Sequence, residues 1–197
     1  MPCRSPAENR LPPQPPHGAL LDALQKHVLE CVAPALDSAL ADVDDYLFDR
    51  SQSGEEALGM IALRELRRVR GHMTQQFRLS VLTRFKALRE HRAESAGAVD
   101  DAGLSLLSDQ ALEQQLAVEQ LAAAVLRSHA DAFEVVSKRL CVVTGQTELL
   151  PRENPLSPAF LAASLGKAMD HQEMEDELRI VAFKYFERAL AETIAEL

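Results

Sequence analysis

The chain contains no tryptophan, and aromatic residues make up only 5% of its 197 residues. Proteins that bind single strands by base stacking need aromatic platforms, so this mode of nucleic-acid binding is disfavoured. The three cysteines, Cys3, Cys31 and Cys141, are too few and too scattered for a disulfide framework or a zinc cage. No run of about 18 uncharged apolar residues occurs, so we expect no membrane span.

The N-terminal segment has no apolar core of the kind that a signal peptide needs, because prolines interrupt it. Proline lacks the N–H donor and restricts the residue before it. We therefore expect residues 1–18 to form a disordered proline-rich tail, and residues 19–197 to form the folded domain. Together with the scattered cysteines, this favours a cytoplasmic location.

Apolar residues amount to 47% of the sequence, which is too high for a disordered chain. From Gly18 onward they recur every three or four residues, as expected for amphipathic helices. The first such stripe continues in phase across Pro34, which favours a kink or a tight restart of the helix there. A second stripe without proline runs from Glu55 to about His91, equivalent to a helix of about 55 Å. Gly59 and Gly71 on this stripe are interpreted as points of close helix approach.

Further helices are expected from near Ser108, over 159–169, and over the region bearing Leu178 to Ile194. Helix ends are also marked. Gly145 suits a left-handed C-terminal cap, and Ser157 suits an N-cap followed by Pro158 at the first helical position. Capping boxes are expected from two Ser/Asp and Glu pairs, Ser53 with Glu56 and Asp170 with Glu173. No alternating strand pattern appears. The predicted fold is all-α, an antiparallel bundle of about five helices with one unusually long helix.

Catalytic constellations are missing from the sequence. There is no glycine-rich phosphate loop, no nucleophile elbow and no inward-facing Glu-x-x-His pair. His171 and Glu175 are interpreted as part of a solvated helix N-terminus, and Cys141 as a small buried hydrophobe. We therefore predict no catalytic residue, no metal site, no cofactor and no enzymatic activity.

Charge is distributed unevenly along the chain, whose formal net charge is −9. Residues 62–92 carry nine basic and two acidic residues, whereas residues 19–49 carry seven acidic residues and one lysine. Helical periodicity places five arginines away from the apolar stripe: Arg64, Arg67, Arg68, Arg78 and Arg89. This basic face has three interpretations. It pairs with the acidic first helix and sets the register, which we favour; it binds an acidic protein partner; or it binds nucleic acid or anionic lipid.

Three blocks resemble a long, largely helical proteobacterial family. They are Asp44-Asp45-Tyr46-Leu47-Phe48 with the arginines that follow and Phe77, then Leu104-Ser105-Leu106-Leu107 with Leu116-Ala117-Val118-Glu119, then Asn154-Pro155-Leu156-Ser157-Pro158 with Tyr185-Phe186-Glu187. The family is a domain of unknown function, and some of its members are labelled thymidine phosphorylase. The resemblance covers about residues 20–197.

The resemblance implies that this chain is the N-terminal part of a longer bacterial protein, whose C-terminal portion is similar to a small β-barrel of the kind that binds a cyclic dinucleotide. No residue here supports the phosphorylase label. Asp44 and Asp45, followed by Leu47 and Phe48 near a helix end, are expected to anchor the turn, with the aspartates pairing with Arg70 or Arg84 across the hairpin. Asn154, Pro155 and Pro158 are expected to form a rigid turn. The predicted function is a non-catalytic helical module for interaction or regulation. Its expected partners are a protein or other domains of the longer chain, with self-association as a further option and with nucleic acid disfavoured. Its alternative is anion binding through the basic face.

Overall fold

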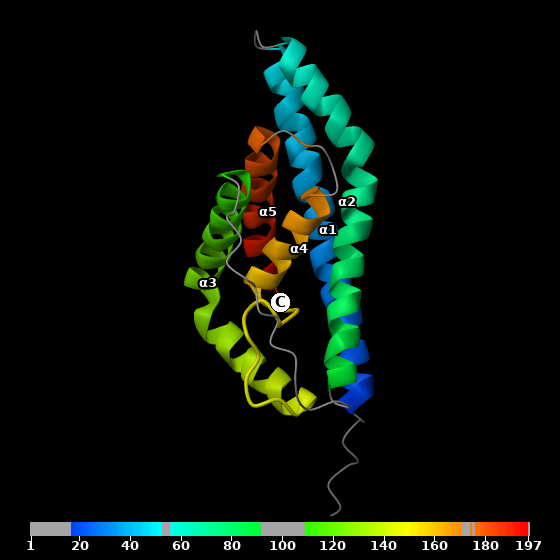
Figure 1. Cartoon of the computed structure of the whole chain (residues 1–197), viewed down its shortest axis with the longest axis vertical. Coiled ribbons are helices and arrows are strands. Elements are labelled where there is room, and N and C mark those ends of the chain that lie inside the picture. The colour runs from blue at the N-terminus through cyan, green and yellow to red at the C-terminus, as the bar shows by residue number, and fades with distance from the viewer. Residues whose placement is uncertain (1–16, 53–55, 92–108, 171–173, 175, 197) are drawn as a thin grey trace, which may run out of the picture.

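The computed structural model describes residues 17–52, 56–91, 109–170, 174 and 176–196. These residues form five α-helices and no strand, so the predicted all-α fold is confirmed (Figure 1). The helices are α1 (His17–Gln52), α2 (Glu56–His91), α3 (Asp109–Thr144), α4 (Pro158–Asp170) and α5 (Asp176–Glu196). The expected proline-rich tail, residues 1–18, lies outside the described residues except for its last two positions. The expected capping box also lies outside, because Ser53 and the side chain of Glu56 are not described.

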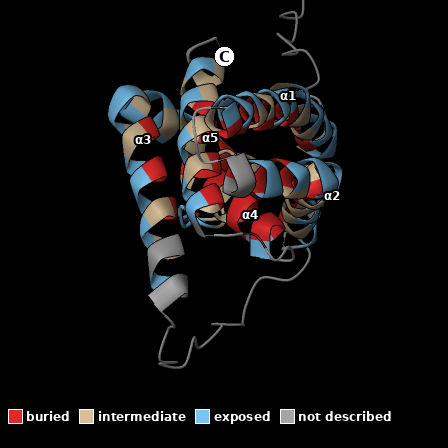
Figure 2. Ribbon diagram, turned by 90° about the horizontal axis from the view of Figure 1, so that it is seen from above, coloured by how far each residue is buried: buried red, intermediate tan, exposed pale blue. Residues whose placement is uncertain are grey.

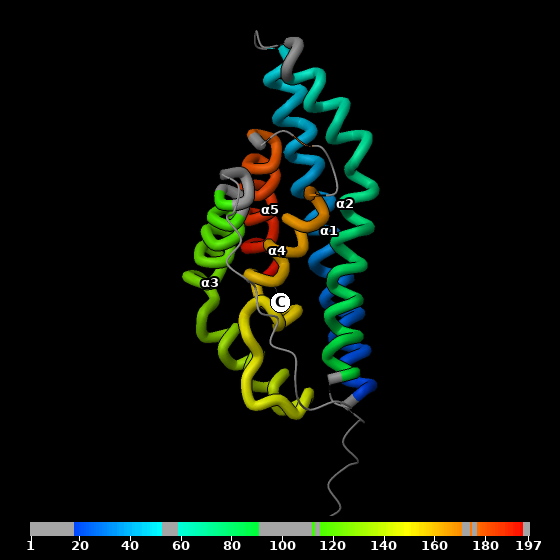
Figure 3. The backbone as a smooth tube through the Cα atoms, viewed as in Figure 1, coloured from blue at the N-terminus to red at the C-terminus, as the bar shows by residue number. Residues whose placement is uncertain are grey.

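The first two helices form a long hairpin. Contacts join Asp22 to Arg89, Asp37 to Thr74 and Asp44 to Arg67, so α1 and α2 run in opposite directions. The tube in Figure 3 shows that the end of this hairpin, where α1 passes into α2, extends beyond the other three helices. The predicted long helix is present as α2, but its length is not unusual within the molecule, because α1, α2 and α3 each span 36 residues.

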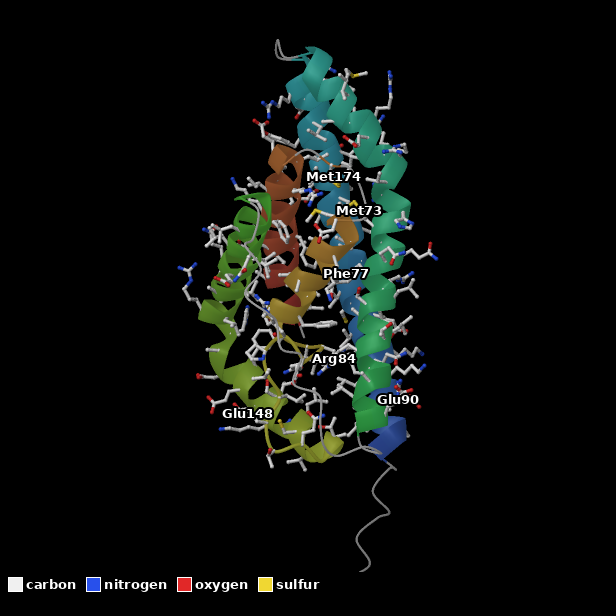
Figure 4. The ribbon with its side chains drawn as sticks, in the orientation of Figure 1. Met73, Phe77, Arg84, Glu90, Glu148 and Met174 are labelled. Atoms are coloured by element: carbon white, nitrogen blue, oxygen red, sulfur yellow. The ribbon has the colours of Figure 1, made fainter. Side chains whose placement is uncertain are left out.

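A single main core fills the space between the helices. α1 packs against α2 and α5, α4 packs against α2 and α3, and α3 also packs against α5. Buried residues therefore line the inner faces, as the view along the bundle in Figure 2 shows. At the centre, the rings of Phe77 and Phe186 meet edge to face with their centroids 5.7 Å apart. Met73 and Phe77 lie on the inner side of α2 in Figure 4.

A second, smaller apolar cluster closes the opposite end of the hairpin. It joins Leu21 of α1 and Leu88 of α2 to Leu140 and Leu149, which lie near the end of α3. Cys141 is half-buried against this cluster, so it lies at the edge of an apolar contact. The two ends of the hairpin therefore differ, since one is packed on the bundle and the other projects from it.

Pro34 does not interrupt α1, which continues from His17 to Gln52. Proline cannot donate to the carbonyl of Glu30, one turn earlier. Both Pro34 and Glu30 are exposed, so water can satisfy that carbonyl and the helix continues. α3, by contrast, bends at His129, whose backbone angles are φ −136° and ψ 23°. No proline or glycine marks this bend.

The ends of α3 and α4 follow the predicted capping chemistry. Gly145 has a positive φ of 71° and ends α3, and the N–H of Gln146 donates to the carbonyl of Cys141 at 3.0 Å. The hydroxyl of Ser157 accepts a hydrogen bond from the N–H of Ala159 at 3.1 Å, and Pro158 is the first residue of α4. Asp170 does not begin α5, because it is the last residue of α4 and accepts a hydrogen bond from Arg179.

Candidate functional site

The seam between α1 and α2 is held by charged groups on its outer edge. Arg67 binds the carboxylate of Asp44 in a bidentate manner, with Nε–Oδ1 and Nη2–Oδ2 distances of 2.7 Å. This hydrogen bonding keeps the pKa of Asp44 below its ordinary value, and the Arg67 pKa is raised for the same reason. One turn further, Arg70 donates to the main-chain carbonyl of Asp37 at 2.8 Å. The acidic first helix and the basic second helix therefore meet in a defined register.

Arg89 makes a similar contact at the other end of the seam. Its Nη2 lies 2.7 Å from a carboxylate oxygen of Asp22 and also donates to the side-chain carbonyl of Gln25. Its buried Nε has no hydrogen-bond acceptor among the residues that the structure describes. Arg89 is thus anchored to α1 through its Nη2 nitrogen.

The predicted basic face is divided by these contacts. Arg67 and Arg89 bind acidic residues of α1 and belong to the seam. Arg68 lies 3.9 Å from Glu65 on its own helix and is exposed. Arg64 and Arg78 are exposed, and neither makes an ion pair with a described residue. Two of the five arginines are therefore engaged by carboxylates of α1, although Arg67 is also 58% exposed, and the other three are exposed and make no ion pair with α1.

The motif residues near the end of α1 have different partners from those expected. Asp44 binds Arg67 and not Arg70 or Arg84, because helix rotation places Arg67 opposite it. Asp45 is exposed, and so is Phe48, with 46% of its surface accessible. Arg84 points away from α1 and donates to the main-chain carbonyl of Glu153, in the segment that joins α3 to α4 (Figure 4).

The segment around Asn154 forms a hydrogen-bonded turn before α4. The side-chain carbonyl of Asn154 accepts a hydrogen bond from the N–H of Leu156 at 2.9 Å, while its amide donates to the hydroxyl of Ser137 at 2.8 Å. Asn154, Pro155 and Pro158 are all buried. The turn thus fixes α4 relative to α3 and has a packing role.

The projecting end of the α1–α2 hairpin carries exposed apolar side chains. Phe48, Met60 and Ile61 expose 46%, 45% and 57% of their surfaces. Phe48 lies one turn beyond Asp44 on α1, and Met60 lies two turns before Arg67 on α2. Helical periodicity therefore places Phe48 and Met60 on the same side of the hairpin as the Asp44–Arg67 pair. We call Phe48, Met60, Ile61 and the neighbouring Arg64 the hairpin-end patch.

The described part of the chain contains no cluster of metal-ligand side chains and no membrane-spanning helix. Among those residues, no group of three or more His, Cys, Asp or Glu side chains converges on a point where an ion could bind. No described helix is both long and apolar enough to cross a membrane. His171 and Glu175, considered above as a helix N-terminus, lie outside the described residues.

Comparison with known proteins places the chain in a family without an assigned function. No curated protein matches it, and no solved structure matches it. A family model described as "Protein of unknown function (DUF1631) N-terminal domain" matches residues 16–197, which is nearly the whole chain. The chain therefore belongs to the DUF1631 family of unknown function, through the N-terminal domain of that family.

Proposed function

We propose that this domain is a non-catalytic interaction module of the cytoplasm, and that the hairpin-end patch binds a protein partner. The observation that carries the proposal is the exposure of Phe48, Met60 and Ile61 at the projecting end of the hairpin. Aromatic, methionine and arginine side chains are the types enriched in protein interfaces. The hairpin-end patch has all three types next to one another.

The charge of the patch indicates the chemistry of the partner. Arg64 is exposed and makes no ion pair with a described residue, so its charge is available to a carboxylate. We infer a partner that presents an apolar side chain beside an Asp or Glu. A twofold dimer through this patch would bring two copies of Arg64 close together, which favours a different protein over a second copy. The match to an N-terminal domain supports a role beside further domains of a longer chain.

Site-specific photo-crosslinking in the native cells tests this proposal. A photoreactive phenylalanine analogue replaces Ile61 in one variant. In a control variant it replaces Lys26, an exposed residue near the start of α1 and therefore at the opposite end of the hairpin from the patch. We expect a discrete crosslinked protein from position 61 that is absent from position 26. The crosslink should be lost with Arg64→Glu and retained with Arg78→Glu, which makes the same charge change two turns or more away on the same helix.

Three outcomes would contradict the proposal. They are the same crosslinked products from positions 61 and 26, a product made of two copies of this chain, and a crosslink that survives Arg64→Glu. The first would show non-specific collision, the second self-association, and the third would remove the arginine from the interface.

Anion binding remains a second candidate because Arg64 and Arg78 have no carboxylate partner among the described residues, and Arg68 is only 3.9 Å from one. Retention on heparin and on phosphatidylglycerol vesicles at increasing salt tests it. The triple variant Arg64→Glu, Arg68→Glu, Arg78→Glu should then lose retention. Its control is Lys26→Glu, Lys138→Glu, Arg188→Glu, which makes the same charge change on α1, α3 and α5. Equal retention of the two variants would show that the arginines of α2 are not responsible.

A further inference from the structure

A cleft of about 490 Å³ lies between α2 and α4, beside the segment that joins α3 to α4. Its volume is in the range of small-molecule sites. Residues from three parts of the chain line it: the stretch 76–87 of α2, Arg152 of the joining segment, and the stretch 160–167 of α4. The cleft is separate from the hairpin-end patch, so it does not depend on the function proposed above.

The cleft is positively charged. Arg84, Arg152 and Lys167 line it, and no carboxylate is among its lining residues. The nearest acidic groups compensate this charge only weakly, since Glu153 Oε2 is 3.9 Å from Arg84 and Glu119 Oε1 is 4.0 Å from Arg152. Lys167 makes no ion pair with a described residue. Burial also lowers the pKa of Arg84, which the carboxylate of Glu153 opposes, so its guanidinium is partly desolvated. An anion in the cleft would therefore relieve an unfavourable charge.

A serine hydroxyl also lines the cleft. Ser164 exposes only 3% of its surface and lines the cleft, and its hydroxyl makes no hydrogen bond with any residue in the described ranges. Other serine and threonine hydroxyls within the helices, such as those of Ser80 and Thr144, donate to a carbonyl of the preceding turn. Among the described residues, Arg89 Nε is the one fully buried side-chain nitrogen or oxygen atom without a partner, so water reaches the hydroxyl of Ser164 and a ligand acceptor can replace that water.

The remaining walls are apolar. Phe160 and Ala163 of α4 and Leu79 of α2 face the same space, and Leu79 exposes 45% of its surface. Leu79 does not belong to the buried core cluster, which contains its neighbours Phe77 and Val81. The cleft thus combines cationic and hydroxyl donors with an aromatic and aliphatic wall. This combination suits a ligand with an anionic group on an apolar body.

We propose that the α2–α4 cleft binds a small organic phosphate, with the phosphate held by Lys167, Arg152 and the hydroxyl of Ser164, and the apolar part against Phe160 and Leu79. Three cations favour a dianion over a singly charged carboxylate. The guanidinium of Arg84, already held by the carbonyl of Glu153, supplies positive charge from the floor of the cleft.

Titration of the full chain with phenyl phosphate tests the proposal, with calorimetry for affinity and NMR for location. We expect saturable binding with shift changes centred on 76–87 and 160–167. Lys167→Glu should weaken the affinity by about tenfold or more, and Ser164→Ala by about threefold or more. Lys26→Glu makes the same charge change on α1, away from the cleft, and should leave the affinity within about twofold. Because Lys167 is exposed, its replacement leaves the core intact.

Comparison ligands separate the parts of the proposal. Benzoate, phenol and inorganic phosphate should each bind more weakly than phenyl phosphate. Benzoate lacks the second negative charge, phenol lacks any charge, and inorganic phosphate lacks the apolar group. Benzoate binding as tightly as phenyl phosphate would overturn the assignment to phosphate, and phenol doing so would overturn the role of charge. Absence of saturable binding below about 10 mM, or equal affinities of wild type and Lys167→Glu, would overturn the site as a whole.

Discussion

Arg67 donates two hydrogen bonds, each 2.7 Å long, to the carboxylate of Asp44 across the seam between α1 and α2. The pair joins positions 23 residues apart near the projecting end of the hairpin. At this end the hairpin extends beyond α3, α4 and α5, as Figure 1 shows, although Arg50 of α1 still lies 3.5 Å from Glu177 of α5. The charged pair therefore has a direct part in keeping the two helices in register there.

Replacement of Asp44 should make this contribution visible in the pH dependence of stability. The folded-state pKa of Asp44 lies below its unfolded value, so the pair stabilises the fold above the unfolded pKa, near 4. That stabilisation is lost as the pH falls through the folded pKa. Thermal unfolding should give a lower Tm for Asp44→Asn than for wild type at pH 7, and the difference should shrink below about pH 4.

Asp42→Asn is the matched control for this experiment. Asp42 is exposed on the same helix and makes no ion pair with a described residue, so its replacement should change Tm little at pH 7. A Tm difference for Asp44→Asn that stays constant between pH 7 and pH 3 would show that the carboxylate charge is not the cause.

Two glycines of α2 should respond oppositely to alanine. A Cβ on Gly59 would lie 3.0 Å from the Cα of Ser51, whereas nothing lies within 4 Å of a Cβ on Gly71. Gly71→Ala should therefore stabilise the protein by about 0.5–1 kcal/mol through helix propensity. Gly59→Ala should destabilise it, because the backbones of α1 and α2 would have to separate. Urea unfolding measures both, and a Gly59→Ala variant as stable as Gly71→Ala would show that the close contact is not required.

These two glycines also show what the sequence could predict. The sequence predicts close helix approach at both glycines, and only Gly59 lies at such a contact. Local signals were reliable: the cap at Gly145 and the Ser157–Pro158 start of α4 depend on neighbouring residues alone. Close approach depends on how one helix is rotated against another, and the residues near Gly71 in the sequence do not determine that rotation.

The sequence also predicts the partners of charged residues only in part, because these partners depend on how the helices are rotated against one another. The uneven charge of residues 19–49 and 62–92 predicts attraction between the first two helices. The sequence pairs Asp44 with Arg70 or Arg84, whereas in the structure Asp44 binds Arg67. The α2–α4 cleft was not foreseen at all, because Arg84, Arg152 and Lys167 are far apart in the sequence and form no recognisable motif. Only the packing of α4 against α2 brings them together.

Arg84 should be important for stability, in contrast to the other arginines on its helix. Its side chain is only 24% exposed, and its guanidinium donates to the carbonyl of Glu153. Arg84→Met keeps much of the apolar stem but leaves that carbonyl without its donor, which should cost about 1–3 kcal/mol in the free energy of unfolding. Arg78→Met, at an exposed position, should stay within about 0.5 kcal/mol of wild type. Equal losses in urea unfolding would mean that Arg84 acts only through general charge.

Asn154 should couple energetically to Ser137 because its amide joins α3 to the turn before α4. Asn154→Ala removes two hydrogen bonds, the one that the Asn154 amide donates to Ser137 and the one that its side-chain carbonyl accepts from the N–H of Leu156. We therefore expect a loss of about 1–3 kcal/mol in the free energy of unfolding. Ser137→Ala removes only the first bond and should cost less. In a double-mutant cycle the two changes should be non-additive by about 1 kcal/mol. Additive losses would place the importance of Asn154 in the turn alone, whereas the coupling would show that the turn orients α4, and with it the α4 wall of the cleft, from α3.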